Sequence, residues 1–319
     1  MRALSGIQPS GAVHIGNYFG AIKQYVALQE KHEGFYFIAN YHALTSIRDA
    51  ATLRDYTLNL AADLLALGID PDRATLFMQS DIPEVTELTW LLSCVTPMGL
   101  LERCVAYKEK VGEGLSPDHG LFAYPVLQAA DILIYDSDLV PVGQDQKQHV
   151  EVTRDMGVKF NNTFGEVFKL PEAYILSDVA VVQGTDGRKM SKSYGNAILV
   201  FQEPDELKQQ VMSVKTDSRP IEEPKDPESC NVYNLYALVA GEEDREAVAE
   251  RYRTGDIGYG EAKGLLLEAM TEYFAPHREK RAELEADPDY VRDVLKAGAE
   301  RARAEARKTL DRAREAAGV

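Results

Sequence analysis

The chain has 319 residues, of which 45% are hydrophobic and 27% charged, and its formal net charge is −16. This length and composition are those of a globular protein with one large domain or two modest ones. No apolar run approaches the roughly 18 to 20 residues that cross a bilayer, so we expect no membrane partner. The segment from Met1 to Ile7 lacks the pattern of a signal peptide, which favours a cytoplasmic location.

The negative charge argues against a protein that coats nucleic acid, because neutralising phosphates needs a surplus of Lys and Arg. We therefore expect no DNA partner. The segment 292–319 is an exception, with eight basic and five acidic residues. A charge-rich helix of this kind is usually a solvated face, and that is the prediction for this segment.

The three cysteines, Cys94, Cys104 and Cys230, form no CxxC pair. An odd number without such spacing predicts neither a disulfide framework nor a metal centre. We expect them to be small core or near-surface residues.

The first half of the chain alternates apolar runs with amphipathic stretches. This alternation predicts a doubly wound α/β fold with a parallel sheet. The predicted strands are 3–7, 35–39 and 74–79, and a helix is predicted at 52–67. From about residue 196 the pattern is helical, with helices predicted at 204–214, 231–240, 245–254, 259–285 and 290–317. We therefore predict an α/β domain over 1–195 and a helical domain over 196–319, with the proline-containing stretch 216–229 as a linker or mobile loop.

A glycine-rich turn follows the first predicted strand and runs from Gly6 to Asn17. In a doubly wound sheet such a turn is where ligands bind, and glycines let the backbone approach a nucleotide closely. His14 and Asn17 add side-chain donors. Alone this pattern is weak, because turns need glycine in any case and a lone histidine is more often structural.

A second polar segment, Gly184 to Ser193, has two glycines followed by two lysines and two serines within five residues. A flexible backbone that carries such point charges can close over a polyphosphate. Composition alone leaves a solvated loop as the alternative.

Together the two segments, His14-Ile-Gly-Asn17 and Lys189-Met-Ser-Lys-Ser193, resemble the paired signatures of class I aminoacyl-tRNA synthetases. Three further stretches, Ser5–Gly11, Tyr124–Leu133 and Val140–His149, look like those of the tryptophanyl enzymes of bacterial type. The resemblance runs from residue 3 to the end of the chain.

The resemblance implies a tryptophan–tRNA ligase and a set of site residues. The implied catalytic residues are His14, Asn17, Lys110, Lys189, Lys192 and Ser193. The implied ATP-binding residues are Gln8, Pro9, Ser10, Gly16, Asn17, Gly143, Gln144, Asp145, Val181 (or Val182), Lys189, Met190, Ser191, Lys192 and Ser193. The implied tryptophan-binding residues are Leu4, His42, Tyr124, Gln128, Asp131, Val142 and Gln146. Mg²⁺ is expected on ATP oxygens and water, so no protein metal ligand is implied.

One position also has a physical argument. Tyr124, Gln128 and Asp131 are spaced i, i+4 and i+7, so they share one face of a predicted helix. An indole N–H only donates a hydrogen bond, and a carboxylate is its natural acceptor. The resemblance assigns that role to Asp131.

Two positions depart from the family pattern. Gln128 stands where well-known bacterial relatives have methionine, so an amide with its own hydrogen-bonding needs replaces a soft apolar contact beside the ring. Asn17 stands where many class I enzymes have histidine, but asparagine is common there in tryptophanyl enzymes. ATP binding is still implied.

The resemblance further implies that the helical domain reads the anticodon of tRNA(Trp) and that the enzyme is a homodimer. Three alternatives stay open: a compact tyrosyl-tRNA synthetase, a paralogue that no longer charges tRNA, and an active duplicate with a second role. The intact Lys189–Ser193 segment argues against loss of activity.

Overall fold

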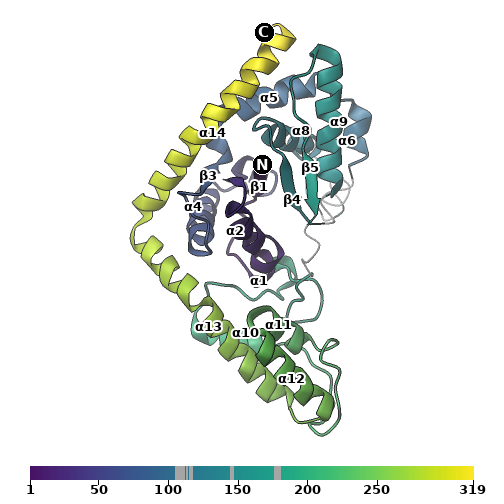
Figure 1. Ribbon diagram of the computed structural model, residues 1–319, viewed down its shortest axis with the longest axis vertical. Coiled ribbons are helices and arrows are strands. Elements are labelled where there is room, and N and C mark those ends of the chain that lie inside the picture. The colour runs from purple at the N-terminus through teal and green to yellow at the C-terminus, as the bar shows by residue number, and fades with distance from the viewer. Residues whose placement is uncertain (105–111, 113, 115–117, 144–146, 176–180) are drawn as a thin grey trace. The chain divides into compact units, whose positions relative to one another are not determined.

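The computed structural model describes residues 1–104, 112, 114, 118–143, 147–175 and 181–319 (Figure 1). The chain forms two compact units. The first consists of Met1–Gly11, Gln24–Ser177 and Asp287–Val319, and the second of Ala12–Lys23 and Asp178–Ala286. These bounds differ from the sequence division at residue 195, because each unit is assembled from segments that are distant in the chain.

A five-stranded parallel sheet forms the centre of the first unit. Its strands are β1 (Arg2–Ile7), β2 (Glu33–Ile38), β3 (Ala74–Met78), β4 (Leu139–Val142) and β5 (Glu172–Ile175). They lie in the order β3-β2-β1-β4-β5, and all the pairs are parallel. The chain therefore winds outward in both directions from β1, so the switch point is between β1 and β4. The predicted doubly wound fold class is confirmed.

Helices connect the strands and pack on the sheet. Those of the first unit are α2 (Lys23–Gln29), α3 (Asn40–Ala43), α4 (Ala50–Ala66), the 3₁₀ turn η2 (Gln79–Asp81), α5 (Pro83–Ser93), α6 (Met98–Glu102), α8 (His119–Leu133), α9 (Lys147–Phe164) and α14 (Pro288–Ala317). Local sequence sets their ends. Asp49 caps α4 by accepting the Thr52 N–H at 2.7 Å, and Gly68, with φ of +110°, ends its last turn.

The last helix, α14, packs against β3 and α5 in the first unit (Figure 1). Its apolar stripe, which includes Leu295, Ala302 and Leu310, is buried. Gly298 faces the backbone of β3 so closely that a Cβ there would lie 1.8 Å from the Leu76 carbonyl oxygen. Because β3 is an edge strand, the helix also covers an edge that would otherwise be open to pairing.

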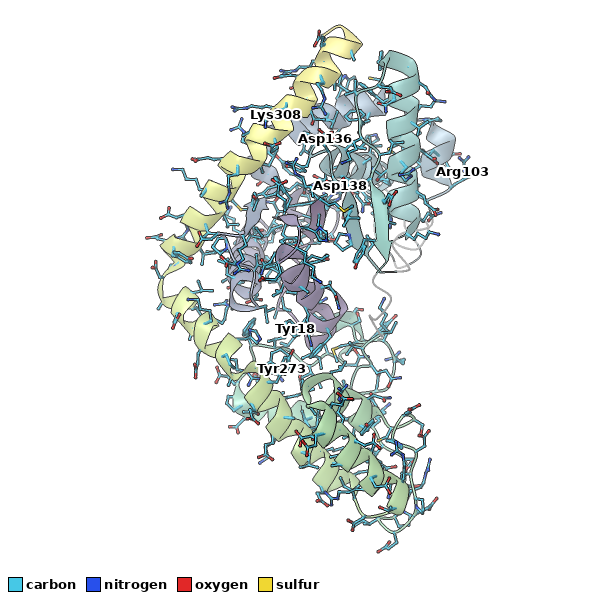
Figure 2. All side chains as sticks on the ribbon, in the orientation of Figure 1. Tyr18, Arg103, Asp136, Asp138, Tyr273 and Lys308 are labelled. Carbon is cyan, nitrogen blue, oxygen red and sulfur yellow. The ribbon has the colours of Figure 1, made fainter. Side chains whose placement is uncertain are left out.

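Most basic residues of α14 bind other elements of the first unit. Arg303 and Arg307 both bind Glu84, at 3.0 Å, while Arg312 binds Asp136 at 2.8 Å. Arg314 pairs with Glu87 at 2.6 Å, and Arg301 donates to the Pro71 carbonyl at 3.0 Å. These five residues therefore bind the rest of the first unit, while Arg301, Arg307 and Arg312 stay exposed, as the prediction of a solvated face requires. Figure 2 labels Asp136, the partner of Arg312, and Lys308 on α14.

The second unit is mainly helical. Its helices are α1 (Ile15–Asn17), the π-helical turn η1 (Tyr18–Ile22), the 3₁₀ turn η4 (Lys192–Tyr194), α10 (Pro204–Met212), α11 (Asn231–Val239), α12 (Glu242–Thr254) and α13 (Tyr259–Ala286). α13 packs on α10 and α11. α13 also contacts η1, where the hydroxyls of Tyr18 and Tyr273 lie 3.3 Å apart. Both residues are labelled in Figure 2.

The stretch 216–229, predicted as a linker or mobile loop, lies inside the second unit and does not connect the two units. Lys225 anchors it. This side chain is 3% exposed, and its ammonium donates to the carbonyls of Ile221 and Glu223 at 2.9 Å each. All three cysteines are free. Among the described residues, no helix combines the length and apolar character that a bilayer crossing needs.

Candidate active site

The carboxyl ends of the parallel strands bring the first group of predicted site residues to one edge of the sheet. Gln8 follows β1 and Gly143 follows β4, and Gln79, which is not a predicted site residue, follows β3 at the same edge. The crevice outside these ends, next to the switch point, is where doubly wound folds bind ligands.

A buried carboxylate lies at the centre of this group. Asp131, on α8, is 2% exposed. Its carboxylate accepts two hydrogen bonds from the Gln79 amide, at 2.7 and 3.0 Å, and lies 3.0 Å from Nε2 of His42. Gln79 is itself fixed, because its Oε1 accepts the Tyr41 N–H at 3.0 Å. The carboxylate is therefore held in one orientation by two side chains from different elements.

Burial raises the pKa of Asp131 above its ordinary value, while the hydrogen bonds and charge of His42 and the hydrogen bond from Gln79 oppose that shift. A carboxylate in this position favours a further hydrogen-bond donor, because each such bond stabilises its ionised form. A ligand N–H would supply one.

The aromatic side of this region is formed by Tyr124, about two turns before Asp131 on α8. Its ring lies edge-on to His42, with centroids 6.1 Å apart, and its hydroxyl is 3.2 Å from Nε2 of His149. A cavity of about 600 Å³ opens beside the two rings, and Thr86, Leu121 and Leu127 also line it.

The other predicted tryptophan-binding residues that the structure describes lie on β1, β4 and α8. Leu4 is fully buried in β1, and Val142 is partly buried at the end of β4. Gln128 is half-buried one turn before Asp131. Neither Leu4, Gln128, Asp131 nor Val142 lines the cavity of about 600 Å³. A larger cavity of about 1100 Å³, between α4 and α14, is lined by none of the predicted site residues.

The ATP residues predicted in the first unit lie on the two loops at the switch point. Gln8 donates to the Ser46 hydroxyl at 3.4 Å, Pro9 is buried, and Ser10 is exposed. Gly143 is half-buried after β4. Four predicted residues, Lys110, Gln144, Asp145 and Gln146, lie outside the described part of the chain.

The second unit holds His14 and Asn17, which form a reciprocal cap. Nδ1 of His14 accepts the Asn17 backbone N–H at 3.1 Å, and Oδ1 of Asn17 accepts the His14 N–H at 3.2 Å. Because Nδ1 is an acceptor, the proton of the neutral ring is on Nε2. Gly16 lies close to His14 and Met190, since a Cβ there would lie 2.8 Å from the His14 ring and 3.3 Å from Cβ of Met190.

His14 is kept neutral by its surroundings. Burial, and secondarily the charge of Lys192, lowers the pKa of His14 to about 4. At neutral pH its ring therefore presents an Nε2–H donor without adding a positive charge.

The predicted phosphate-binding loop begins as a short hairpin. Met190 N–H donates to the Val182 carbonyl at 2.9 Å, and Gly184 N–H donates to the Arg188 carbonyl at 2.7 Å. Val181 is exposed, whereas Met190 is buried. Two backbone bonds, from Ile15 to Ile198 and from Val200 to Val13, tie the segment after the loop to the His14 turn.

The side chains of the loop point to different places. Lys192 Nζ donates to the Ala12 carbonyl at 3.2 Å, which brings one of the two predicted lysines to the His14 turn. The hydroxyls of Ser191 and Ser193 lie 2.8 Å apart. Lys189 is exposed. Among the described residues, no three His, Cys, Asp or Glu side chains are grouped to hold a metal ion.

Sequence reasoning missed two residues that organise these groups. Gln79 is the last residue of a predicted strand, and its place at the carboxyl edge is a signal for a polar role. Asn196 follows the Lys189–Ser193 motif and is 2% exposed. A buried amide next to a charged loop needs partners, but the sequence does not show which ones.

Comparisons with known proteins agree with this architecture. The family model of the class I tRNA synthetases for W and Y matches residues 1–275. A tryptophan–tRNA ligase from Rhodopirellula baltica is 58% identical over 319 residues, which cover 100% of both chains. One from Fusobacterium nucleatum subsp. nucleatum is 55% identical over 319 residues, covering 100% of this chain and 98% of the relative.

A solved structure is similarly close. The crystal structure of tryptophanyl-tRNA synthetase from Campylobacter jejuni complexed with ADP and tryptophan matches with a TM-score of 0.95, at 51% identity, over 100% of both chains. Sequence, fold and the two signature segments therefore agree. The chain belongs to the class I aminoacyl-tRNA synthetases, in the family of the bacterial tryptophan–tRNA ligases.

Proposed function

We propose that the chain is a tryptophan–tRNA ligase, which activates L-tryptophan with ATP and transfers it to tRNA(Trp). The observation that carries this proposal is the buried carboxylate of Asp131, fixed by Gln79 and His42 at the carboxyl edge of the sheet. The relatives that are 51–58% identical over the whole chain bear this activity in their names.

Tryptophan binding follows from the chemistry of that carboxylate. Asp131 accepts the indole N–H, because an indole nitrogen can only donate and the two other donors already fix the carboxylate. The ring lies among the side chains named from the sequence, which stay predictions: Leu4, His42, Tyr124, Gln128, Val142 and Gln146.

In the first step the tryptophan carboxylate attacks the α-phosphorus of ATP, and pyrophosphate leaves. The protein contributes positioning and charge, since the reaction needs no covalent intermediate with a side chain. Lys189, Lys192 and Ser193 bind the leaving pyrophosphate, joined by Lys110. His14 and Asn17 donate hydrogen bonds from a neutral turn, and the other predicted ATP residues hold the nucleotide.

Before this step the Lys192 side chain has a defined hydrogen-bond partner. Its ammonium lies on the Ala12 carbonyl, beside the His14 turn. A phosphate oxygen is a stronger acceptor than a neutral carbonyl, so ATP draws the ammonium away from that contact. Mg²⁺ bound to ATP would screen the charge of the phosphates, and this chemistry requires no ligand set from the protein.

In the second step the tryptophanyl group moves to the 2′-hydroxyl of the terminal ribose of the tRNA. The helical segment 196–286 recognises the anticodon, because unpaired loop bases can be bound one at a time. We place α14 with the α/β part instead, on the strength of its contacts with β3 and α5. The reaction belongs in the cytoplasm.

The proposal includes a homodimer. Two large apolar side chains of the first unit are exposed, Trp90 on α5 at 69% and Met98 on α6 at 62%. Leu91 and Val95 lie between them in the chain, and Leu100 follows Met98. All three are partly buried against the core and extend the apolar surface. A second copy covers this surface, because an isologous contact matches each apolar patch with its own equivalent.

Charging of tRNA tests the whole proposal. Purified protein is mixed with ATP, Mg²⁺, labelled tryptophan and a tRNA(Trp) transcript, and acid-precipitable label is measured. Charged tRNA(Trp), with none formed on a tRNA(Tyr) transcript given labelled tyrosine, supports the proposal. No charging by well-folded protein would favour a paralogue that has lost the activity.

A further inference from the structure

We propose that Asn196 is a positioning residue, which holds the Lys189–Ser193 loop in the conformation that adenylate formation needs. This inference rests on the proposed function for its kinetic consequence. Its structural part stands on the loop alone, so the two can be tested separately.

The side chain of Asn196 makes three contacts with the loop. Its Nδ2 donates to Oδ1 of Asp186 at 2.7 Å and to the Lys189 carbonyl at 3.1 Å. Its Oδ1 accepts the Ser191 backbone N–H at 2.8 Å. The amide therefore uses both its donor and its acceptor, and it fixes the backbone on both sides of Met190.

The backbone of Asn196 adds a fourth contact, because its carbonyl accepts the Thr185 N–H at 2.9 Å. The space for this arrangement depends on Gly184. A Cβ at that position would lie 2.3 Å from Cγ of Asn196 and 2.7 Å from its carbonyl oxygen. The glycine at the start of the loop is thus explained by the asparagine at its end.

Asp186 links the Asn196 side chain to Arg188 at the tip of the loop. It accepts the Arg188 N–H at 3.0 Å and binds the Arg188 guanidinium at 2.6 Å. The hydrogen bond from Asn196, and then those from Arg188, lowers the pKa of Asp186 to about 2. Because Gly187 has φ of +85°, the chain can turn back between these two residues.

Two further hydrogen bonds connect the start of the loop, at Gly184 and Thr185, to later segments of the second unit. Asn231, the first residue of α11, donates from Nδ2 to the Gly184 carbonyl at 2.8 Å. Lys215 N–H donates to the Thr185 carbonyl at 2.7 Å. These two hydrogen bonds hold the start of the loop in place. The Asn196 side chain, through its own hydrogen bonds, then restrains the backbone of Lys189 and Ser191.

The consequence is catalytic, because the proposed role of the two lysines requires them to meet the phosphates at fixed points. A loss of placement of about 1 Å at such groups costs about 100-fold in rate. The substrate contacts proposed above are made by other side chains, so the loss of Asn196 should reduce the rate of activation and leave tryptophan binding in the first unit unchanged.

The test compares Asn196→Ala and the near-isosteric Asn196→Asp with a matched control, Asn161→Ala. Asn161 likewise makes three bonds to a loop backbone, with Val167 and Phe168, but in the first unit. Amide hydrogen exchange of the full-length protein is measured over residues 183–196, together with pyrophosphate exchange into ATP.

For both Asn196 variants we expect amide exchange over residues 183–196 to be faster by at least about tenfold. We also expect kcat of pyrophosphate exchange to be lower by at least about tenfold, with KM for tryptophan changed less than about twofold. Asn161→Ala should change neither loop exchange nor kcat. In Asn196→Asp the paired carboxylates should also raise the pKa of Asp186, and Asp186→Asn in that background should recover part of kcat by restoring an amide–carboxylate bond.

Unchanged amide exchange in Asn196→Asp would overturn the structural part. Faster amide exchange with unchanged kcat would overturn the positioning role. If the parent protein activates no tryptophan, the proposed function fails, and the amide exchange of the loop still decides whether Asn196 orders it.

Discussion

Asp131 is the residue that selects the amino acid in the proposed mechanism. Asp131→Asn keeps the shape but replaces one oxygen with an N–H donor. Gln79 donates to both oxygens, so a donor then faces a donor. We expect KM for tryptophan in pyrophosphate exchange to rise by about tenfold or more. Gln128→Met is the comparison on the same helix face, because it leaves the carboxylate and its donors in place. An unchanged KM in Asp131→Asn would exclude this carboxylate as the indole acceptor.

Lys192 is a residue that we expect to bind the leaving pyrophosphate. Lys192→Ala should lower the rate of adenylate formation by at least about tenfold, since removal of a preorganised charge at developing negative charge costs that much or more. Rapid-quench measurement of tryptophanyl-adenylate gives the rate. If the rate is unchanged, the loop has no part in the chemistry.

His14 should give the stability of the protein a specific dependence on pH. Its folded pKa is about 4, below the 6.5 of an exposed histidine. Between these values the unfolded chain binds the proton and the folded chain does not, so this contribution to stability falls as pH falls from about 6.5 to 4. In His14→Gln the corresponding decrease should be smaller. Urea unfolding of both proteins at several pH values measures it, and parallel curves would contradict a neutral, buried His14.

At the scale of the element, α14 is held against β3 by a close contact at Gly298. Gly298→Ala places a methyl group 1.8 Å from the Leu76 carbonyl oxygen, so the helix must move. We expect a loss of about 3 kcal/mol in the free energy of unfolding. Gly120→Ala, on α8 of the same unit, has open space around the new methyl and should change stability by less than about 1 kcal/mol. Equal losses in the free energy of unfolding for the two variants would mean that α14 can move away from β3 at Gly298 without loss of stability.

The elements were predictable from the sequence because their signals are local. The strands over 3–7 and 74–79 and the helix over 52–67 were placed to within a few residues, since apolar periodicity and Gly68 mark them. The return of α14 to the sheet was not predictable. Its arginines look like a solvated face until Glu84, Glu87 and Asp136, more than 170 residues earlier, are placed beside them.

The candidate site divides in the same way. Motif residues such as His14 and Lys192 could be named, because their types and order carry the family resemblance. Gln79 and Asn196 could not, because their roles arise from hydrogen bonds with residues that the fold brings near them. A buried amide can be recognised only when its burial is known.

At the scale of the whole molecule, the proposed dimer can be tested through its apolar surface. Trp90→Glu puts a charge on each copy of an isologous contact, so we expect it to dissociate the dimer into folded monomers. Analytical ultracentrifugation gives the mass. Tyr290→Glu, an exposed aromatic of α14, is the control and should leave the dimer intact. A monomer in the parent protein, or a dimer in Trp90→Glu, would contradict this surface as the interface.

The most direct measurement of the central claim is pyrophosphate exchange into ATP with tryptophan, tyrosine or phenylalanine supplied separately to the Mg²⁺-containing enzyme. Exchange with tryptophan alone is the predicted result, because in the proposed site the indole N–H donates to the buried carboxylate of Asp131, and phenylalanine has no donor to offer. Exchange with tyrosine would contradict the role of Asp131 and favour a compact tyrosyl enzyme, and no exchange with any of the three would contradict the assignment as an active synthetase.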